Sequence, residues 1–238
     1  MSAPMSGRLG VGVIGAGRVG PVLGAALAAA GHAVVGIATV SEQGRERAEV
    51  LLPGVPVLRV PEVVERSELV LLAVPGGELP DLVSGLAAAG IWRPGQLVAH
   101  THAALGTAVL APALAAGVIP LALHPAMVFT GTSLDLARLR ECYVAVTAPT
   151  VVQPIGQALV VEMGAEPLIV AEGDRPAYAE AVATASEFAT AIVDQSTGLL
   201  GGIGVPNPGR VLGGLVRSAV DAALARAAGR NDPLPDVE

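Results

Sequence analysis

Apolar stretches that predict β-strands alternate with stretches of helical character along most of the chain. Strands are expected at 9–14, 33–39, 56–59, 69–74, 96–101, 118–123, 142–147 and 167–171. Helices are expected between them at 18–30, 42–52, 79–89, 103–116 and 151–164. Apolar strands that alternate with helices through short loops are typical of an open parallel sheet with helices on both faces.

The pattern changes after Ala171, where the strand-like stretches end. One long helix is expected from Asp174 to Leu200, and the sequence Pro206-Asn207-Pro208-Gly209 then interrupts the helical pattern. A second helix is expected from about Arg210 to Ala228. The faces of both helices are rich in alanine, glycine and serine, which permits close helix packing.

These patterns predict an α/β fold in two domains. A parallel-sheet domain is expected over 1–172, and a small all-helical domain over 173–238 is expected to supply substrate contacts and a dimer interface. Residues 1–8 lead directly into the first strand and show no signal peptide, and residues 231–238 are expected to be disordered.

A glycine motif, Gly15-Ala16-Gly17-Arg18-Val19-Gly20, stands where the first expected strand runs into the first expected helix. In a dinucleotide site the first glycine allows a tight turn, the second lets a pyrophosphate approach bare backbone, and the third lets helix and strand pack closely. The amino terminus of the helix offers free N–H groups and a partial positive charge to the phosphates. A second strand follows at the spacing of a βαβ unit, so the motif predicts a Rossmann-type dinucleotide-binding domain.

The end of the second expected strand indicates which dinucleotide binds. A carboxylate usually stands there in NAD sites to accept a hydrogen bond from the ribose 2′-hydroxyl, but this chain has Thr39-Val40-Ser41. Hydroxyls and guanidinium groups suit a 2′-phosphate. Arg18 lies inside the glycine motif, and Arg45 and Arg47 follow Ser41. The pattern favours NADP, as NADPH in a reductase, over NAD.

Three alternatives stay open at this stage. Glu42 would restore an NAD site if the strand ended slightly later, and Arg45 and Arg47 could instead belong to a solvated helix face. Methyltransferases that bind S-adenosylmethionine also carry a glycine motif. They commonly have an acidic residue just before it, whereas this chain has Val13-Ile14, so methyl transfer is disfavoured.

Composition narrows the class further. A net charge of −7 gives no basic surface for nucleic acid, and a single cysteine, Cys142, indicates a reducing cytoplasm. All 14 basic residues are arginine, which excludes a lysine nucleophile or lysine general acid. The stretch from Pro94 to Leu134 carries no formal charge, but Pro112, Gly117 and Pro120 divide it into short elements, so no membrane span is expected.

Candidate chemistry lies at the ends of three expected strands, because ligands of open α/β sheets bind beyond the carboxyl ends of the strands. One expected strand ends at Val74 and Pro75, the next at His100-Thr101-His102, and a third at His124. Of these residues, Val74, Pro75 and Thr101 are expected beside the cofactor. A histidine with a pKa near neutral pH can donate a proton to a carbonyl oxygen or imine nitrogen as hydride is transferred. His100, His102 and His124 are therefore catalytic candidates. The alternative is that they tie down loops, while a zinc site is disfavoured because no carboxylate or thiolate stands at ligand spacing.

The first long helix adds a few polar candidates. Tyr178 and Glu187 are nine positions apart, so they face different sides of a straight helix, and Glu187 is the candidate for the substrate site. Arg175, Arg210 and Arg217 could hold a substrate carboxylate, with surface placement as the default expectation.

Several segments of the sequence resemble those of a bacterial family of Rossmann-like proteins that carry a C-terminal helical domain of unassigned function. This family is related to pyrroline-5-carboxylate, 6-phosphogluconate and ketopantoate reductases. The segments that match are the glycine motif, 94–101, His124-Pro125-Ala126-Met127 with the residues up to Gly131, 175–181 and 210–213. The resemblance implies an NADP-linked reductase of a small keto acid such as ketopantoate, which dimerises through the helical domain.

The chain also departs from that family. His102-Ala103 stands where the family reads Ser-Gly, Glu187 and Ala222 stand where it has asparagine, and the helical domain is shortened relative to the family. The first hypothesis is therefore an NADPH-dependent reductase of a C=O or C=N bond in a small substrate. The alternative is a diverged, non-catalytic NADP-binding sensor or scaffold.

Overall fold

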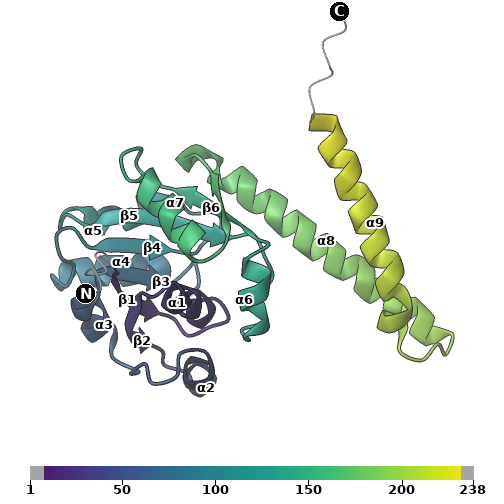
Figure 1. The fold of residues 1–238 in the computed structure, drawn as a ribbon, viewed down its shortest axis with the longest axis horizontal. Helices are drawn as coiled ribbons and strands as arrows, with labels where there is room; N and C mark the ends of the chain where they lie inside the picture. The colour runs from purple at the N-terminus through teal and green to yellow at the C-terminus, as the bar shows by residue number, and fades with distance from the viewer. Residues whose placement is uncertain (1–7, 232–238) are drawn as a thin grey trace, which may run out of the picture. The chain divides into compact units, whose positions relative to one another are not determined.

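Seven strands form one sheet in the order β2-β1-β3-β4-β5-β6-β7 (Figure 1). The computed structural model describes residues 8–231. All neighbouring strands are parallel except β5 and β6, which are antiparallel. The strands are β1 Gly10–Ile14, β2 Ala33–Ala38, β3 Leu69–Leu72, β4 Leu97–His100, β5 Ile119–Pro125, β6 Tyr143–Thr147 and β7 Glu166–Ile169. The predicted fold class, a Rossmann-type sheet followed by long helices, is confirmed.

Helices cover both faces of this sheet. They are α1 Gly20–Ala29, α2 Glu42–Leu51, α3 Val60–Arg66, α4 Leu79–Ala88, α5 Ala111–Leu114, α6 Leu134–Leu139 and α7 Gln153–Glu162, with short 3₁₀ turns η1 Thr107–Leu110 and η2 Glu172–Asp174. Alternate residues of the central strands enter two separate cores. In β1, Val13 packs on the α1 side of the sheet and Ile14 on the α3 and α4 side. Burial on both faces explains why the strands read as unbroken apolar stretches.

The strand order changes direction at β1, so a topological switch point lies at the carboxyl end of that strand. From β1 the chain passes through α1 to β2 on one side, and it then returns to β3 on the other side. Such a switch point opens a crevice beyond the carboxyl end of β1, where the glycine motif lies. The predicted dinucleotide site therefore stands at the position that this topology favours.

The structure corrects the element predictions in three places. Residues 56–59 form no strand, since only Val57 makes an isolated bridge to Ile37, and helix α3 follows directly with Pro61 in its first turn. The expected helix over 103–116 is a loop followed by η1 and α5, because Gly106 is extended and Pro112 begins the helical turn. Helix α6 and the reversed direction of β6 were not predicted.

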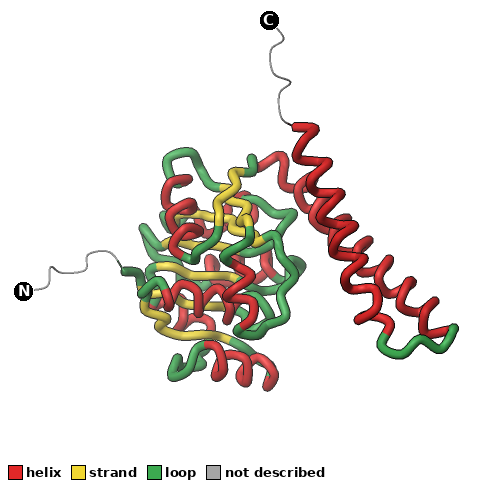
Figure 2. Tube along the Cα trace, turned by 45° about the vertical axis from the view of Figure 1, so that its right-hand side comes forward, coloured by secondary structure: helices red, strands yellow, loops and turns green. Residues whose placement is uncertain are grey.

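Two long helices follow the sheet: α8 Arg175–Gly202 and α9 Pro208–Asn231, joined by a turn in which Asn207 has a positive φ of 52° (Figure 2). Packing contacts divide the chain into two compact units, Met1–Ala181 and Val182–Glu238. The division falls within α8, whereas the expected domain boundary at 172–173 precedes that helix. Of the tail that was expected to be disordered, 231–238, Asn231 is the last residue of α9, while 232–238 lie outside the described residues, as do residues 1–7.

The second unit buries little of its own apolar surface. From Val182 to Ala228 no side chain is fully buried. Its exposed apolar residues include Phe188, Ile192, Leu199, Ile203, Val211, Leu215 and Leu224. Within residues 8–231, no helix has the length and apolar character needed to cross a membrane.

Candidate functional site

The glycine motif forms a tight loop between β1 and α1. Gly15 has a φ of +104°, its N–H donates to the Ala38 carbonyl at 2.9 Å, and a Cβ there would overlap the Ala73 backbone. A Cβ at Gly20 would likewise meet the Gly15 carbonyl, so both positions require glycine. Gly17 is exposed and has open space where a Cβ would stand. Its backbone is therefore free to face a ligand, as the motif predicted.

An apolar cavity of about 710 Å³ lies on one side of this loop. The ends of three parallel strands and the start of α3 contribute to it. Its lining includes Gly15, Gly17, Thr39, Val40, Arg59, Val60, Val74, Pro75, Glu78 and Leu82. The cavity thus brings together Thr39, Val74 and Pro75, which the sequence had placed only at separate strand ends.

A second cavity, of about 330 Å³, lies at the next residues of the same loop, and we call it the histidine cavity. It is lined by Arg18, Val19, Thr101, His124, Pro125, Met127, Val128 and Phe129. Because Gly17 lines the first cavity and Arg18 the second, the glycine loop stands between the two. This arrangement could hold the two ends of one extended ligand across a shared loop.

His100 is completely buried at the end of β4, and both of its ring nitrogens bond to backbone. Nε2 lies 2.8 Å from the Gly106 carbonyl, and Nδ1 accepts the His102 N–H at 3.2 Å. A carbonyl can only accept, so the ring is in the Nε2–H tautomer. Burial, with the Arg175 cation nearby, lowers the pKa of His100 to about 4. The ring closes the loop that follows β4.

His102 and Thr101 occupy the loop itself. The Nδ1 of His102 accepts the Ala104 N–H at 3.2 Å, and its ring packs against Gly76, where a Cβ would meet Nε2. Partial burial and the Arg175 cation lower the pKa of His102. Thr101 reaches the histidine cavity, whereas His102 faces the loop after β3. The structure therefore brings Thr101 and His124 together and leaves His102 beside them.

His124 pairs with a tyrosine from the first turns of α8. The Tyr178 hydroxyl lies 2.9 Å from Nδ1 of His124 and 3.4 Å from its carbonyl, and the two rings meet edge to face at 5.6 Å. Burial, followed by the Arg175 cation, lowers the pKa of His124 to about 4, and burial raises the pKa of Tyr178. Both groups are therefore neutral near pH 7. This pair could not be predicted from the sequence, because its members are 54 positions apart.

Arg175 is the buried cation behind these groups, and it overturns the expectation that this side chain lies at the surface. It is 0% exposed. Its guanidinium donates to the Thr147 hydroxyl at 2.7 Å, the Ala122 carbonyl at 2.7 Å and the Ala145 carbonyl at 3.1 Å. It also lies 5.9 Å from the centre of the Tyr178 ring. Arg175 therefore fixes the start of α8 to β5 and β6.

A carboxylate near this cation holds the adjoining loop. Glu172 accepts from the backbone N–H groups of Thr107 and Ala108 and from the Thr107 hydroxyl, at 2.8–3.0 Å. These bonds, with the Arg175 cation, outweigh the effect of burial and lower the pKa of Glu172. No ion pair joins the two residues in the described chain. Arg175 is thus a buried positive charge that is balanced mainly by carbonyl and hydroxyl oxygens.

The other predicted residues have diverse placements. The Ser41 hydroxyl accepts the Gly44 N–H at 3.0 Å and caps α2, while Arg45 is exposed. Arg47 folds back and donates to the Ala16 carbonyl at 3.3 Å, so it does not lie on a solvated face. Glu187 is exposed in the second unit and lines neither cavity. No cluster of histidine, cysteine and acidic residues suited to a metal occurs within residues 8–231.

Arg59 is a cavity residue that sequence reasoning missed. It precedes α3, lines the apolar cavity, and donates to the Glu62 carboxylate at 2.9 Å with its side chain 82% exposed. Residues 56–59 were predicted to form a strand, so Arg59 was not considered as a cavity residue. Arg18, which was expected beside the ribose, lines the histidine cavity instead.

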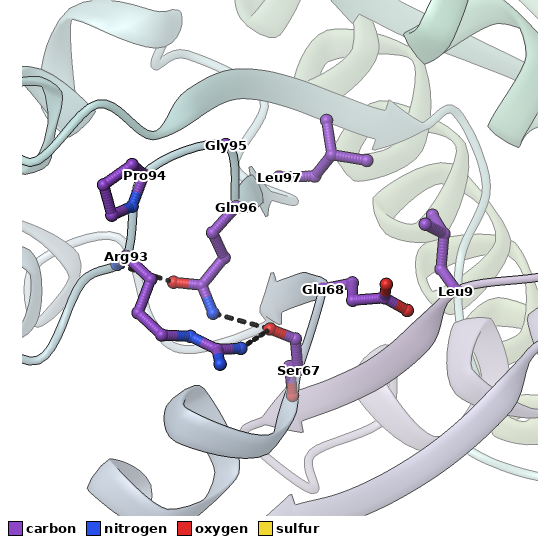
Figure 3. A pocket seen from close by; sticks show the side chains of 8 residues that line it. All are labelled: Leu9, Ser67, Glu68, Arg93, Pro94, Gly95, Gln96 and Leu97. Atoms are coloured by element: carbon purple, nitrogen blue, oxygen red, sulfur yellow. Dashed lines mark hydrogen bonds between the residues drawn. The ribbon is translucent and has the colours of Figure 1, made fainter.

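A further hollow, of about 350 Å³, lies at the amino ends of the strands (Figure 3). Its polar groups bond to the protein itself: Gln96 donates to the carbonyls of Val64 and Ser67 at 2.8 Å, and Arg93 donates to Ser67 at 2.7 Å. The Gly10 N–H donates to the Glu68 carboxylate at 2.7 Å. These bonds join the end of α3 and the segments that precede β3 and β4. The polar groups of this hollow are thus already bonded, so the candidate site is at the opposite, carboxyl end.

Comparison with known proteins agrees with this architecture. The model of a Rossmann-like domain matches residues 2–125, and that of a domain of unknown function, DUF2520, matches residues 142–231. The chain belongs to the Rossmann-like family. This Rossmann-like protein thus has the family relationship that its sequence motifs indicated. No protein of curated function matches its sequence.

Solved structures share the fold at low identity. A Bacteroides fragilis protein classed provisionally as an NADP oxidoreductase has a TM-score of 0.74 at 16% identity, over 95% of this chain and 82% of the other. An imine reductase from Pseudomonas has a TM-score of 0.68 at 15% identity, over 94% and 77%. Pyrroline carboxylate reductase from Plasmodium falciparum, solved with NADP bound, has 0.67 at 11%, over 95% and 82%. The Rossmann-like protein is thus distantly similar in fold to NAD(P)-dependent reductases.

Proposed function

We propose that this protein is an NADPH-dependent oxidoreductase that reduces a C=O or C=N bond of a small substrate, such as a keto acid. The observation that carries the proposal is the pair of cavities on either side of the glycine loop. Their volumes, about 710 and 330 Å³, each lie within the range of ligand pockets, about 300–1,000 Å³.

The residues present fit a dinucleotide. The apolar cavity suits an adenosine group, and the exposed backbone at Gly17 and Arg18, before the amino terminus of α1, suits the pyrophosphate. The histidine cavity then suits the nicotinamide and the substrate. When bound, NADPH supplies a hydride. The chain's own residues hold the reacting groups together and provide the proton.

The phosphate preference rests on the rim of the apolar cavity. No carboxylate stands at the end of β2, where Thr39 and Val40 line the cavity, and the Arg59 guanidinium lines it from the start of α3. A 2′-phosphate would gain a charge-assisted hydrogen bond from Arg59. We therefore propose NADPH rather than NADH, with Arg59 joining Ser41 and Arg45 as a candidate phosphate contact.

The histidine cavity contains one group suited to deliver a proton. His124 lines it, whereas His100 has both nitrogens bonded to backbone. We assign proton delivery to His124, a loop-closing role to His100, and substrate contacts to Thr101 and Arg18. His102 and Glu187 line neither cavity and have no assigned step.

We propose that the protein forms a homodimer through its second unit, Val182–Glu238. Its exposed apolar side chains recur along α8 and α9, and a folded monomer would leave them in water. A second copy of this chain is the proposed occupant, as in the dimeric family that the sequence resembles. Light scattering should give a dimer, and Leu215→Arg combined with Leu224→Arg should give a monomer. A wild-type monomer would contradict this part of the proposal.

A thermal-shift titration with NADPH, NADH and S-adenosylmethionine tests the cofactor. A ligand at 100 times its Kd stabilises the folded state by about 2.7 kcal/mol, and we expect NADPH to give the largest shift. Gly17→Ala should fold normally yet weaken NADPH binding by about tenfold, or about 1.4 kcal/mol, because a methyl group would occupy the phosphate approach. The matched control is Gly85→Ala in α4, which also has open space and should bind normally.

Turnover then separates the enzyme from a non-catalytic binder. NADPH oxidation in the presence of keto acids and cyclic imines, followed by absorbance, is the expected result. Stabilisation by NADPH without any oxidation would favour the sensor or scaffold. A shift with S-adenosylmethionine alone would contradict the cofactor proposal.

A further inference from the structure

The His124–Tyr178 pair has one bonded nitrogen and one open nitrogen. Nδ1 of His124 lies 2.9 Å from the Tyr178 hydroxyl, and Nε2 makes no hydrogen bond within residues 8–231. In that part of the chain no buried side-chain nitrogen or oxygen lacks a partner, so Nε2 is accessible. His124 lines the histidine cavity. The ring therefore connects the tyrosine hydroxyl to the place proposed for the substrate.

We infer that Tyr178 and His124 form a proton relay, in which Tyr178 is the source of the proton and His124 transfers it. The inference rests on the proposed reductase function. As the substrate carbon accepts a hydride, the electron pair of the C=O or C=N π bond moves to oxygen or nitrogen. That atom takes the proton from Nε2, while Nδ1 takes the hydroxyl proton of Tyr178. Tyrosinate remains. After the product leaves, Nε2 takes a proton from solvent and Nδ1 returns its proton to Tyr178, which restores the starting state.

Hydrogen-bond geometry sets the direction of this relay. The Tyr178 hydroxyl has one proton and two possible acceptors, Nδ1 at 2.9 Å and the His124 carbonyl at 3.4 Å. In the relay, the hydroxyl proton lies in the shorter of these two contacts, the one with Nδ1. His124 is then in the Nε2–H tautomer, with its N–H toward the cavity. From this state, His124 can release its Nε2 proton and accept the Tyr178 proton at Nδ1 in one step. The imidazole then stays neutral and the tyrosine becomes tyrosinate.

A single-proton mechanism fits the site less well. Burial and the Arg175 cation keep His124 neutral near pH 7, so an imidazolium donor is scarce. A neutral imidazole that lost its Nε2 proton without replacement would become an imidazolate. Proton transfer from Tyr178 in the same step avoids that charge. The tyrosine therefore supplies what the histidine alone lacks.

Fixed charges around the pair favour a negative tyrosine over a positive histidine. The Arg175 guanidinium lies 5.9 Å from the Tyr178 ring, and Arg18 lines the same cavity as His124. The nearby His100 and His102 have lowered pKa values, and burial raises the pKa of the Cys142 thiol near Tyr178, so these three groups are neutral. Glu172 is the acidic group near Arg175, and it bonds to Thr107 and Ala108. Arg175 is a positioning residue that makes transient tyrosinate less costly.

Nuclear magnetic resonance of the histidine rings tests the relay without any substrate. The chain has four histidines, so long-range ¹H–¹⁵N spectra can be assigned with single variants. We expect the Nε2–H tautomer for His124 in the wild type and a mixture of tautomers in Tyr178→Phe. The control is Tyr143→Phe, the other tyrosine, which is exposed on β6 and should leave the spectrum of His124 unchanged. An Nδ1–H tautomer in the wild type would overturn the relay, whatever the protein catalyses.

Kinetics test the same step in the working enzyme. Tyr178→Phe should lower kcat by about 100-fold, as expected for lost acid catalysis, with NADPH affinity and melting temperature near those of the wild type. Rates in mixtures of H₂O and D₂O should curve for the wild type, because two protons move, and become linear in the variant. Tyr143→Phe should keep the wild-type kcat.

The outcomes separate the two proposals. A reductase whose Tyr178→Phe variant keeps wild-type kcat would overturn the relay and leave the proposed function intact. A protein that binds NADPH, has the expected tautomer, and reduces no carbonyl or imine would overturn the proposed function and the relay as a catalytic step. The expected tautomer together with a curved isotope profile supports both.

Discussion

The neighbouring strands β4 and β5 each carry a histidine at the carboxyl end, yet the two side chains have different partners. His100 bonds through both nitrogens to the backbone of its own loop, within six residues of its position. His124 bonds to a tyrosine 54 residues later, and its second nitrogen is accessible. Burial lowers the pKa of both rings to about 4. The two histidines therefore differ in bonding partners and access rather than in pKa, and this difference is the reason for proposing His124, and not His100, as the proton donor.

Arg175 contributes to both regions, so its loss should have the largest effect. Arg175→Met would leave the Thr147 hydroxyl and the carbonyls of Ala122 and Ala145 without this donor, at about 1–3 kcal/mol for each group left unsatisfied. We expect a loss of about 4 kcal/mol in the free energy of unfolding, measured in urea by the fluorescence of Trp92, the only tryptophan.

Arg175→Lys is the matched variant, because it keeps the charge and loses the planar donor geometry. It should lose less stability than Arg175→Met and should keep the pKa of both histidines low. Equal unfolding midpoints for Arg175→Met and the wild type would contradict the structural role assigned to this cation.

Alanine substitutions of His100 and His124 should have different effects on stability and on turnover. His100→Ala removes a buried ring and leaves the Gly106 carbonyl unpaired, so we expect a loss of about 3 kcal/mol in the free energy of unfolding. His124→Ala should cost about 1 kcal/mol while lowering turnover about 100-fold with NADPH affinity nearly intact. The comparison would fail if His124→Ala lost more stability than His100→Ala.

Acid should destabilise the protein through the same groups. Between about pH 6.5 and pH 4, His100 and His124 bind protons in the unfolded state but stay neutral in the folded state. The free energy of unfolding therefore falls as pH falls through this window. The pKa shift of His100 corresponds to at most about 3 kcal/mol. His100→Ala should therefore show a flatter stability profile over this range in urea titrations at each pH. An unchanged profile would rule out His100 as the source.

His102 should show the smallest effect, because it shares the local bonding of His100 with less burial. Its ring accepts one backbone N–H, from Ala104, and packs against Gly76. His102→Ala should cost about 0.5 kcal/mol of stability and leave turnover within about twofold. A large loss of turnover with unchanged stability would move His102 into the proposed catalytic site.

Much of the sheet could be predicted because its signals are local. Seven of the eight expected strands are present, since a strand buried on both faces must be apolar throughout. The eighth, at 56–59, is too short and contains Pro56, and only one bridge forms there. The direction of β6 leaves no mark on residue choice, because a buried strand is equally apolar in either direction.

The sequence by itself determined the order of strands and helices and the glycine loop, since these depend on side-chain periodicity and on backbone conformations that only glycine adopts readily. The tertiary structure decided which polar residues meet. It buried Arg175 under β5 and β6, brought Tyr178 to His124, and placed Arg59 on the apolar cavity. Such meetings join residues far apart in the chain, and they depend on how the elements pack, for which no short segment carries a signal.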